Sequence, residues 1–140
     1  DEEGLAECKT CFGQLVTTVR GATAASECVC PGGWYRPLNA ETGTCQRCPE
    51  GIECASGTDM NSRETWPIVK EGYYADVELS VFNCLDEGRR CREGLPGESC
   101  ADGRRGRVCF ECVDGKAPNS DGTCQPCEPG ADVLPLILIL

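Results

Sequence analysis

The sequence contains no histidine among its 140 residues, and it has few large apolar side chains. Leu, Ile, Val and Phe together number 26, and seven of these lie in the last eight residues. With a net charge of −10, such a composition would normally indicate a disordered chain, and it excludes a conventional buried core for most of the sequence. The missing histidine excludes Ser-His and Cys-His pairs, so these routes of nucleophilic catalysis are closed to this chain.

What the chain has in abundance is cysteine, with 14 residues, together with 17 Gly and 9 Pro. An even and dense set of cysteines predicts a disulfide framework that replaces the missing core. Disulfides persist outside the reducing cytosol, so we expect an extracellular or lumenal location. The chain begins at Asp1 without an apolar leader, which suggests a processed product or a fragment. Its acidity argues against nucleic acid as a partner.

The cysteines form two sets of seven, separated by the long Cys-free interval 55–83. A nine-residue segment, 43–51, recurs as 122–130 with six identities. Because each set is odd, either a bridge crosses between the sets or a cysteine pairs outside the chain. We predict a small disulfide-rich fold that is mostly irregular, with short β-hairpins, little helix and elongated tandem modules.

Secondary structure is expected mainly in the interval 55–83. The residues Val77, Leu79 and Val81 alternate with polar ones, as in a half-buried strand, and Ile68 and Val69 suggest a strand before a turn at 71–72. The interval is also the candidate for a small apolar core, formed by Trp66, Ile68, Tyr73, Tyr74 and Phe82. Segment 14–25 could form a short ribbon or a helical turn.

Residues 21–35, with Gly-Ala-Thr leading into Cys28-x-Cys30-x-x-Gly-aromatic, resemble the ephrin-receptor-like cysteine-rich repeat. Residues 45–51 resemble its Cys-x-x-Cys-Pro-x-Gly continuation, and residues 100–109 are similar to an EGF or laminin-EGF ending. The resemblance implies a disulfide module of secreted or membrane-anchored proteins, including large protist membrane proteins. It divides the chain into an ephrin-receptor-like module (1–54), a Cys-free hairpin insert (55–83), an EGF-like module (84–130) and an apolar segment (131–140).

The same resemblance implies four disulfide pairings, each closing a local loop. These are Cys11–Cys28, Cys30–Cys45, Cys100–Cys109 and Cys112–Cys124. It leaves the pairing of six cysteines open, namely Cys8, Cys48, Cys54, Cys84, Cys91 and Cys127.

Four Cys-x-x-Cys pairs invite two chemical interpretations. They are Cys8/Cys11, Cys45/Cys48, Cys109/Cys112 and Cys124/Cys127. Two such pairs could hold one zinc ion with four thiolates, but if all four pairs did so the other six cysteines would be left over, and the surrounding residues are those of disulfide repeats. A thiol-disulfide exchange enzyme or chaperone is the alternative function, although no periodic helix follows any pair. We therefore predict a non-enzymatic structural or interaction module without catalytic residues, cofactor or metal.

The basic residues are unevenly spread, because six arginines lie within positions 89–107 and give this segment a net charge of +3. This arginine cluster comprises Arg89, Arg90, Arg92, Arg104, Arg105 and Arg107. It could be a solvated surface, or it could bind another protein subunit or an anionic ligand such as a glycan or lipid headgroups. The aliphatic run 133–140 is interrupted only by Pro135, and it could be an edge or core strand, the beginning of a lipid-anchor signal or the start of a transmembrane helix. We favour the helix, so membrane attachment is a further prediction.

Overall fold

The structure is a computed structural model, and it describes residues 11, 13–18, 27–85 and 89–128. This part of the chain contains short β-strands and two 3₁₀ turns, and no helix of seven residues or more. The strands are β1 (Val16–Thr17), β2 (Cys28–Val29), β3 (Trp34–Tyr35), β4 (Gln46–Arg47), β5 (Ile52–Glu53), β6 (Ile68–Val69), β7 (Tyr73–Ala75), β8 (Val81–Asn83), β9 (Arg104–Arg105), β10 (Glu111–Cys112), β11 (Lys116–Pro118) and β12 (Cys124–Pro126). The 3₁₀ turns are η2 (Arg63–Thr65) and η3 (Arg107–Cys109).

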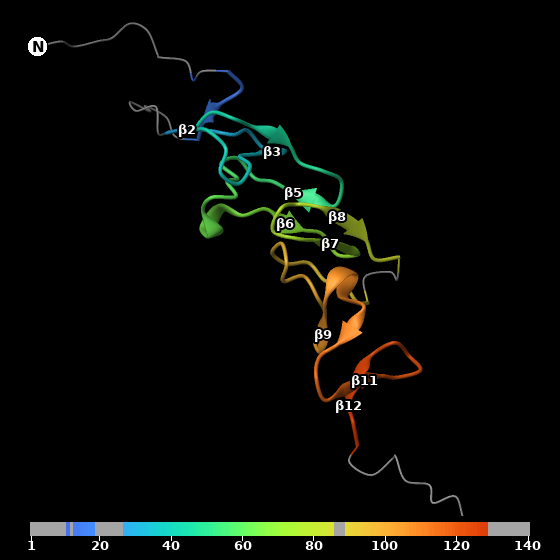
Figure 1. The fold of residues 1–140 in the computed structure, drawn as a ribbon. Helices are drawn as coiled ribbons and strands as arrows, with labels where there is room; N and C mark the ends of the chain where they lie inside the picture. The colour runs from blue at the N-terminus through green and yellow to red at the C-terminus, as the bar shows by residue number, and fades with distance from the viewer. Residues whose placement is uncertain (1–10, 12, 19–26, 86–88, 129–140) are drawn as a thin grey trace, which may run out of the picture.

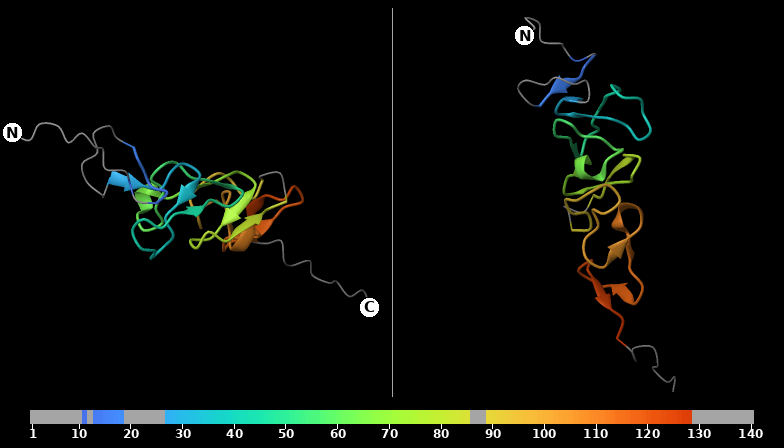
Figure 2. Two further views of the ribbon diagram at one scale, coloured as in Figure 1. Left: turned by 90° about the horizontal axis from the view of Figure 1, so that it is seen from above. Right: turned by 90° about the vertical axis from the view of Figure 1, so that its left-hand side faces the viewer.

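The strands form six separate two-stranded antiparallel sheets, each made by strands that are neighbours in the sequence. They follow one another along an elongated molecule, with β2 near one end and β11–β12 near the other (Figures 1 and 2). The predicted fold class is therefore confirmed: a small, elongated, disulfide-rich fold of short β-hairpins.

Five of the six hairpins begin with the same four-residue turn. In each turn the fourth residue donates its backbone N–H to the first carbonyl over 3.0–3.2 Å, and the third residue is a glycine with φ between +77° and +86°. These are features of a type II turn, in which glycine alone reaches the third position without steric cost. The five glycines are Gly33, Gly51, Gly72, Gly103 and Gly115.

A second hydrogen bond closes each of these hairpins. The residue that follows the returning strand donates its N–H to the carbonyl of the turn glycine over 2.8–2.9 Å. The five donors are Cys48, Lys70, Cys84, Val113 and Cys127. In two cases this donor is also the first residue of the next turn, as Lys70 and Val113 are, so that one hairpin ends where the next begins. The described chain is thus a series of hairpins, two pairs of which overlap by a residue.

Six disulfides join this series, and all of them connect cysteines within 17 residues of each other. Four are the pairs that the family resemblance implies: Cys11–Cys28, Cys30–Cys45, Cys100–Cys109 and Cys112–Cys124. The other two, Cys48–Cys54 and Cys84–Cys91, use cysteines whose partners the sequence left open. Local bridges of this kind stabilise a chain mainly by restricting its unfolded state.

The bridges follow a rule within the Cys-x-x-Cys pairs. The first cysteine pairs with one earlier in the chain, as in Cys45, Cys109 and Cys124, and the second pairs with a later one, as in Cys11, Cys48 and Cys112. Among the described residues no bridge crosses between the two sets of seven, and Cys127 is exposed without a bridge. The remaining cysteine, Cys8, lies outside the described residues.

Two small clusters take the place of a single core. The larger one contains Ile52, Cys54, Met60, Val69, Ala75 and Leu79, bordered by Trp66 and Tyr73 among others. The smaller one consists of buried sulfur, from Cys84, Cys91 and Cys109, with Tyr74, Cys100 and Val108 against it. Apolar burial is therefore concentrated at the middle of the chain, but the side chains expected to form it are not the buried ones: Trp66, Tyr73, Tyr74 and Phe82 are half-buried and Ile68 is exposed.

The strands of this middle region differ in part from those expected. Ile68–Val69 is a strand, followed by the predicted turn, but it pairs with β5 and not with β7. The expected strand over 77–81 is wrong for its first residues: 77–78 form a turn, Leu79 has a φ of +60°, and β8 begins at Val81. Because β5 pairs with β6, the predicted boundary at 54/55 falls inside one hairpin and one core cluster.

Candidate functional site

Half of the arginine cluster lies on β9 (Arg104–Arg105) and at the start of η3 (Arg107), and η3 also carries Val108 and Cys109 of the smaller, sulfur-rich core cluster. The structure shows that these side chains do different things. Arg104 is half-buried, and its guanidinium donates to the backbone carbonyls of Cys109, Phe110 and Gly122. It therefore joins the β9–β10 hairpin to the turn before β12, which is a structural role.

Arg105 makes its contacts within its own hairpin and the next turn. Its Nη2 lies 2.8 Å from Oδ1 of Asp114, and its Nε lies 3.7 Å from Oε2 of Glu111, the residue opposite it in the strand pair. The hydrogen bond to Asp114 and the charge of that carboxylate raise the pKa of Arg105 above its ordinary value. Since both partners are exposed, this ion-pair group adds little stability.

Arg90 and Arg107 each lie over an aromatic ring. The guanidinium carbon of Arg90 is 5.7 Å from the centre of the Phe110 ring, and that of Arg107 is 4.8 Å from the centre of the Phe82 ring. Arg90 also donates to the carbonyl of Cys84 over 2.8 Å. Both contacts cross from β8 and the Cys84–Cys91 bridge to η3, so they connect the middle of the chain to its C-terminal half.

Three cluster members border an open hollow of about 810 Å³. Arg89, Arg92 and Arg104 line it together with four carboxylates, namely Glu71, Glu93, Asp102 and Asp121. Because the lining carries charges of both signs and the carboxylates outnumber the arginines, the hollow is not a simple anion site. The predicted anion-binding role is thus not concentrated in this hollow.

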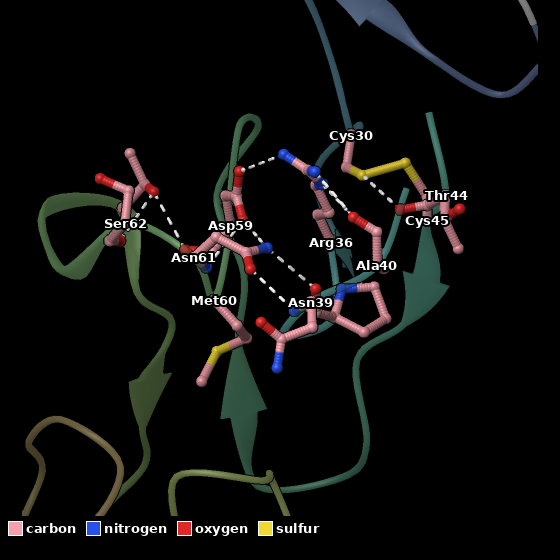
Figure 3. A network of polar contacts seen from close by, with 12 residues as sticks. Cys30, Arg36, Asn39, Ala40, Thr44, Cys45, Asp59, Met60, Asn61 and Ser62 are labelled. Atoms are coloured by element: carbon pink, nitrogen blue, oxygen red, sulfur yellow. Dashed lines mark hydrogen bonds and ion pairs between the residues drawn. A yellow bond between two sulfur atoms is a disulfide. The ribbon is translucent and has the colours of Figure 1, made fainter. Parts of the chain in front are cut away.

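A second polar network lies in the N-terminal half, between the loop after β3 and residues 59–61 (Figure 3). Arg36 donates to the carbonyl of Ala40 from Nε and Nη2, and its Nη1 lies 3.3 Å from Oδ2 of Asp59. Asn61 donates to Oδ1 of Asp59 from its backbone and its side chain, both over 2.8 Å, and its Oδ1 accepts the N–H of Asn39.

In this network burial raises the pKa of Asp59, but the hydrogen bonds from Asn61 and the charge of Arg36 outweigh it, so the pKa lies below its ordinary value. The donors and acceptors of this network are paired with one another. We therefore assign to it the structural role of holding the first hairpins against the middle of the chain.

The Cys-x-x-Cys pairs do not have the arrangement that redox or zinc chemistry requires. A redox pair closes a disulfide between its own two cysteines, whereas Cys45 and Cys48, and likewise Cys109 and Cys112, are joined to other cysteines. Zinc needs free thiolates, and twelve cysteines are in bridges. Within the described residues, no group of three or more His, Cys, Asp or Glu side chains could hold a metal ion.

Two apolar side chains beside the arginine cluster were not singled out by the sequence. Leu85 is 88% exposed and Phe110 is 71% exposed, the highest values among the large apolar residues that the structure describes. Each directly follows a buried cysteine of the sulfur cluster, Cys84 or Cys109. The sequence did offer a sign that these two side chains are exposed, because each follows a cysteine near arginines and neither belongs to an alternating apolar pattern.

The part of the chain that the structure describes contains no helix that is long and apolar enough to span a membrane. The apolar run 133–140 lies outside the described residues. Comparison of the chain with protein-family models, with curated proteins and with solved structures found no match. The resemblance to ephrin-receptor-like and EGF-like modules therefore stays a prediction.

Proposed function

We propose that this chain is a non-enzymatic structural and interaction module of a larger extracellular or lumenal assembly. The observation that carries the proposal is the use of the cysteines, since every described bridge is local and staples successive hairpins into an elongated array. Such an array separates its two ends and presents side chains along its length, which suits a spacer or a docking module.

The disulfides also bear on where the protein is located. Six disulfides in a chain of this size indicate an oxidising, non-cytosolic environment. Within that environment, we propose that the chain belongs to a membrane-attached protein or to a subunit of a membrane-associated assembly. The support for attachment is the apolar run 133–140 in the sequence.

Other protein subunits are the proposed partners. Arg92 and Arg107 are exposed and make no ion pair with the described residues, so their guanidinium groups can bind carboxylates, sulfates or phosphates of a partner. Arg104 and Arg105, by contrast, direct their donors to this chain's own carbonyl and carboxylate oxygens.

The alternative function is a thiol-disulfide exchange enzyme or chaperone that uses a Cys-x-x-Cys pair, and its free thiol would come from Cys127 of the Cys124/Cys127 pair, because the other described cysteines are in bridges. A measurement of reduction potential separates the two functions. Structural bridges should have potentials below about −300 mV and stay closed in a glutathione buffer, whereas a catalytic pair would exchange at a more oxidising potential. Exchange of any Cys-x-x-Cys pair with glutathione near about −200 mV would contradict the structural role and favour the enzyme.

A further inference from the structure

A groove beside the β5–β6 hairpin combines apolar side chains with carboxylates. It is an open hollow of about 270 Å³ between segments 53–58 and 64–68, and we call it the acidic groove. Two carboxylates and three apolar side chains line it, from Glu53, Glu64, Ala55, Trp66 and Ile68. None of the described residues that line it is basic. Pockets for small-molecule ligands hold about 300–1,000 Å³, so the acidic groove has room for one long side chain.

The pairing of β5 with β6 places a carboxylate next to an aliphatic side chain at the surface. Glu53 lies directly opposite Ile68 in this pair, so the two side chains project from the same face of the hairpin (Figure 1). The other face carries Ile52 and Val69, which are buried in the larger core cluster. Ile68 is therefore left at the surface, where it is 37% exposed.

The indole of Trp66 is held in place before any partner arrives. Its Nε1 donates to the carbonyl of Met60 over 3.0 Å, and the guanidinium carbon of Arg63 lies 5.3 Å from the centre of the Trp66 ring. Arg63 is itself held by Glu98, whose Oε1 is 2.6 Å from Nη2 of Arg63. Contact with a ring that is already fixed costs little side-chain entropy, and tryptophan is enriched among the residues that dominate binding energies.

The wall opposite the tryptophan is fixed as well. Thr58 donates to the carbonyl of Ala55 from its hydroxyl over 2.7 Å and from its backbone over 3.2 Å. Gly57 donates its N–H to the carbonyl of Cys30 over 2.8 Å, and Cys54 is bridged to Cys48. The acidic groove is thus preformed on both sides.

The carboxylates identify the kind of partner. Glu53 and Glu64 are exposed, and neither makes an ion pair or a side-chain hydrogen bond with the described residues. The whole chain carries a net charge of −10, which attracts cations to it. Among side chains, lysine best matches such a surface, because its alkyl stem lies along apolar groups while its ammonium stays at the polar edge.

We propose that the acidic groove binds a lysine side chain from a basic segment of another protein. The alkyl stem packs on Ile68 and Trp66, and the ammonium binds the carboxylates of Glu53 and Glu64. This inference rests on the proposed interaction function and names the chemistry of the partner.

The test uses the full chain and three synthetic heptapeptides at low salt. Their central residue is lysine, norleucine, which keeps the stem and lacks the charge, or serine, and the other positions are alanine and serine. Two-dimensional NMR follows the indole N–H signals of the chain's two tryptophans. We expect the lysine peptide to shift the signal of Trp66 and not that of Trp34, the norleucine peptide to bind about tenfold more weakly, and the serine peptide to give no shift.

Variants assign the effect to the acidic groove. Glu53→Gln/Glu64→Gln should weaken the lysine peptide about tenfold and leave the norleucine peptide unchanged. The matched control is Glu41→Gln/Glu78→Gln, which removes the same charge from exposed carboxylates outside the groove and should leave the lysine peptide within about twofold. Ile68→Thr shortens the apolar surface and should weaken both peptides about threefold.

Equal affinity for the lysine and norleucine peptides, or no shift of the Trp66 signal at millimolar peptide, would overturn the proposal. Calcium that shifts the signals of Glu53 and Glu64 when the lysine peptide does not would overturn it in favour of a metal ion. A Trp66 shift that depends on protein concentration, and not on peptide, would overturn it in favour of a second copy of the chain. Failure of the proposed function itself looks different, because it would appear as disulfides that exchange with glutathione, whatever the peptides do.

Discussion

Substitution of Gly51 by alanine tests whether the hairpin turns are as tightly built as the structure indicates. Gly51 has a φ of +86°, so any side chain there costs about 1–2 kcal/mol in backbone strain. A Cβ at this position would also lie 2.5 Å from Cγ and 2.9 Å from Cε1 of Tyr73, and closer still to Cδ1. The ring is held by the larger core cluster and by a hydrogen bond from its hydroxyl to Glu50.

Two costs therefore add at Gly51. Overpacking against the ring contributes about 1–3 kcal/mol beyond the strain, so the free energy of unfolding should fall by roughly 2–5 kcal/mol. The matched control is Gly72→Ala, because Gly72 has nearly the same φ of +84° but no neighbouring group within 4 Å of the point where the added methyl carbon would lie. It should lose only the strain, about 1–2 kcal/mol.

The assay is thermal unfolding of the disulfide-intact proteins, followed by near-ultraviolet circular dichroism. At about 2–4 °C for each kcal/mol, the scale for chains near this length, the two variants should differ in Tm by a few degrees or more, with Gly51→Ala the lower. The double variant Gly51→Ala/Tyr73→Leu should recover part of the loss relative to Tyr73→Leu alone. Equal Tm values for Gly51→Ala and Gly72→Ala would refute the close approach of Tyr73 to the turn.

Three further predictions concern single side chains. Folding lowers the pKa of Asp59, so the contribution of its carboxylate to the free energy of unfolding is present above about pH 4 and is lost as the pH falls through the folded pKa. Urea unfolding should show Asp59→Asn to be less stable than the parent at about pH 7, and the difference in free energy of unfolding should shrink in acid. A difference that stays constant with pH would contradict this. Arg104→Gln removes the donors to three carbonyls and should lower the free energy of unfolding in urea by about 1 kcal/mol or more. The exposed control Arg92→Gln should change it by no more than about 0.5 kcal/mol. The reverse order would be evidence against the assigned contacts. Ser99 is 1% exposed and its hydroxyl has no hydrogen-bond partner within the described structure, so Ser99→Ala should not lower Tm, and a clear fall would mean that the hydroxyl has a partner.

The fold class could be predicted from the sequence because it depends on counts. Fourteen cysteines with so few aliphatic residues leave a disulfide-stapled chain as the stable solution. The hairpin series was harder to see. Only the repeat of 43–51 in 122–130 is visible as identity, whereas the five turns share little more than a glycine in third place, preceded by Gly, Glu or Asp. The backbone conformation requires the glycine and leaves the neighbouring residues free to differ.

The strand at 77–81 was mispredicted because alternation is a weak signal over so short a run. The side chain of Asp76 accepts hydrogen bonds from the backbone of Glu78 and Ser80, which turns the chain where the alternation predicts extension. The sequence shows that arginines are concentrated at 89–107, but it does not show which contact each arginine makes. Whether an arginine binds a carbonyl, a ring or solvent depends on contacts across the fold, such as Arg107 with Phe82, which are 25 positions apart.

The central claim is that the Cys45/Cys48 and Cys109/Cys112 pairs each direct the first cysteine backward and the second forward, so that local bridges staple the hairpins in series. A peptide map of the non-reduced protein tests it most directly, because cleavage after Arg47 and after Glu111 separates Cys45 from Cys48 and Cys109 from Cys112. The account predicts Cys45 linked to Cys30, Cys48 to Cys54, Cys109 to Cys100 and Cys112 to Cys124. A bridge within any of these Cys-x-x-Cys pairs, or free thiols at these positions, would contradict it.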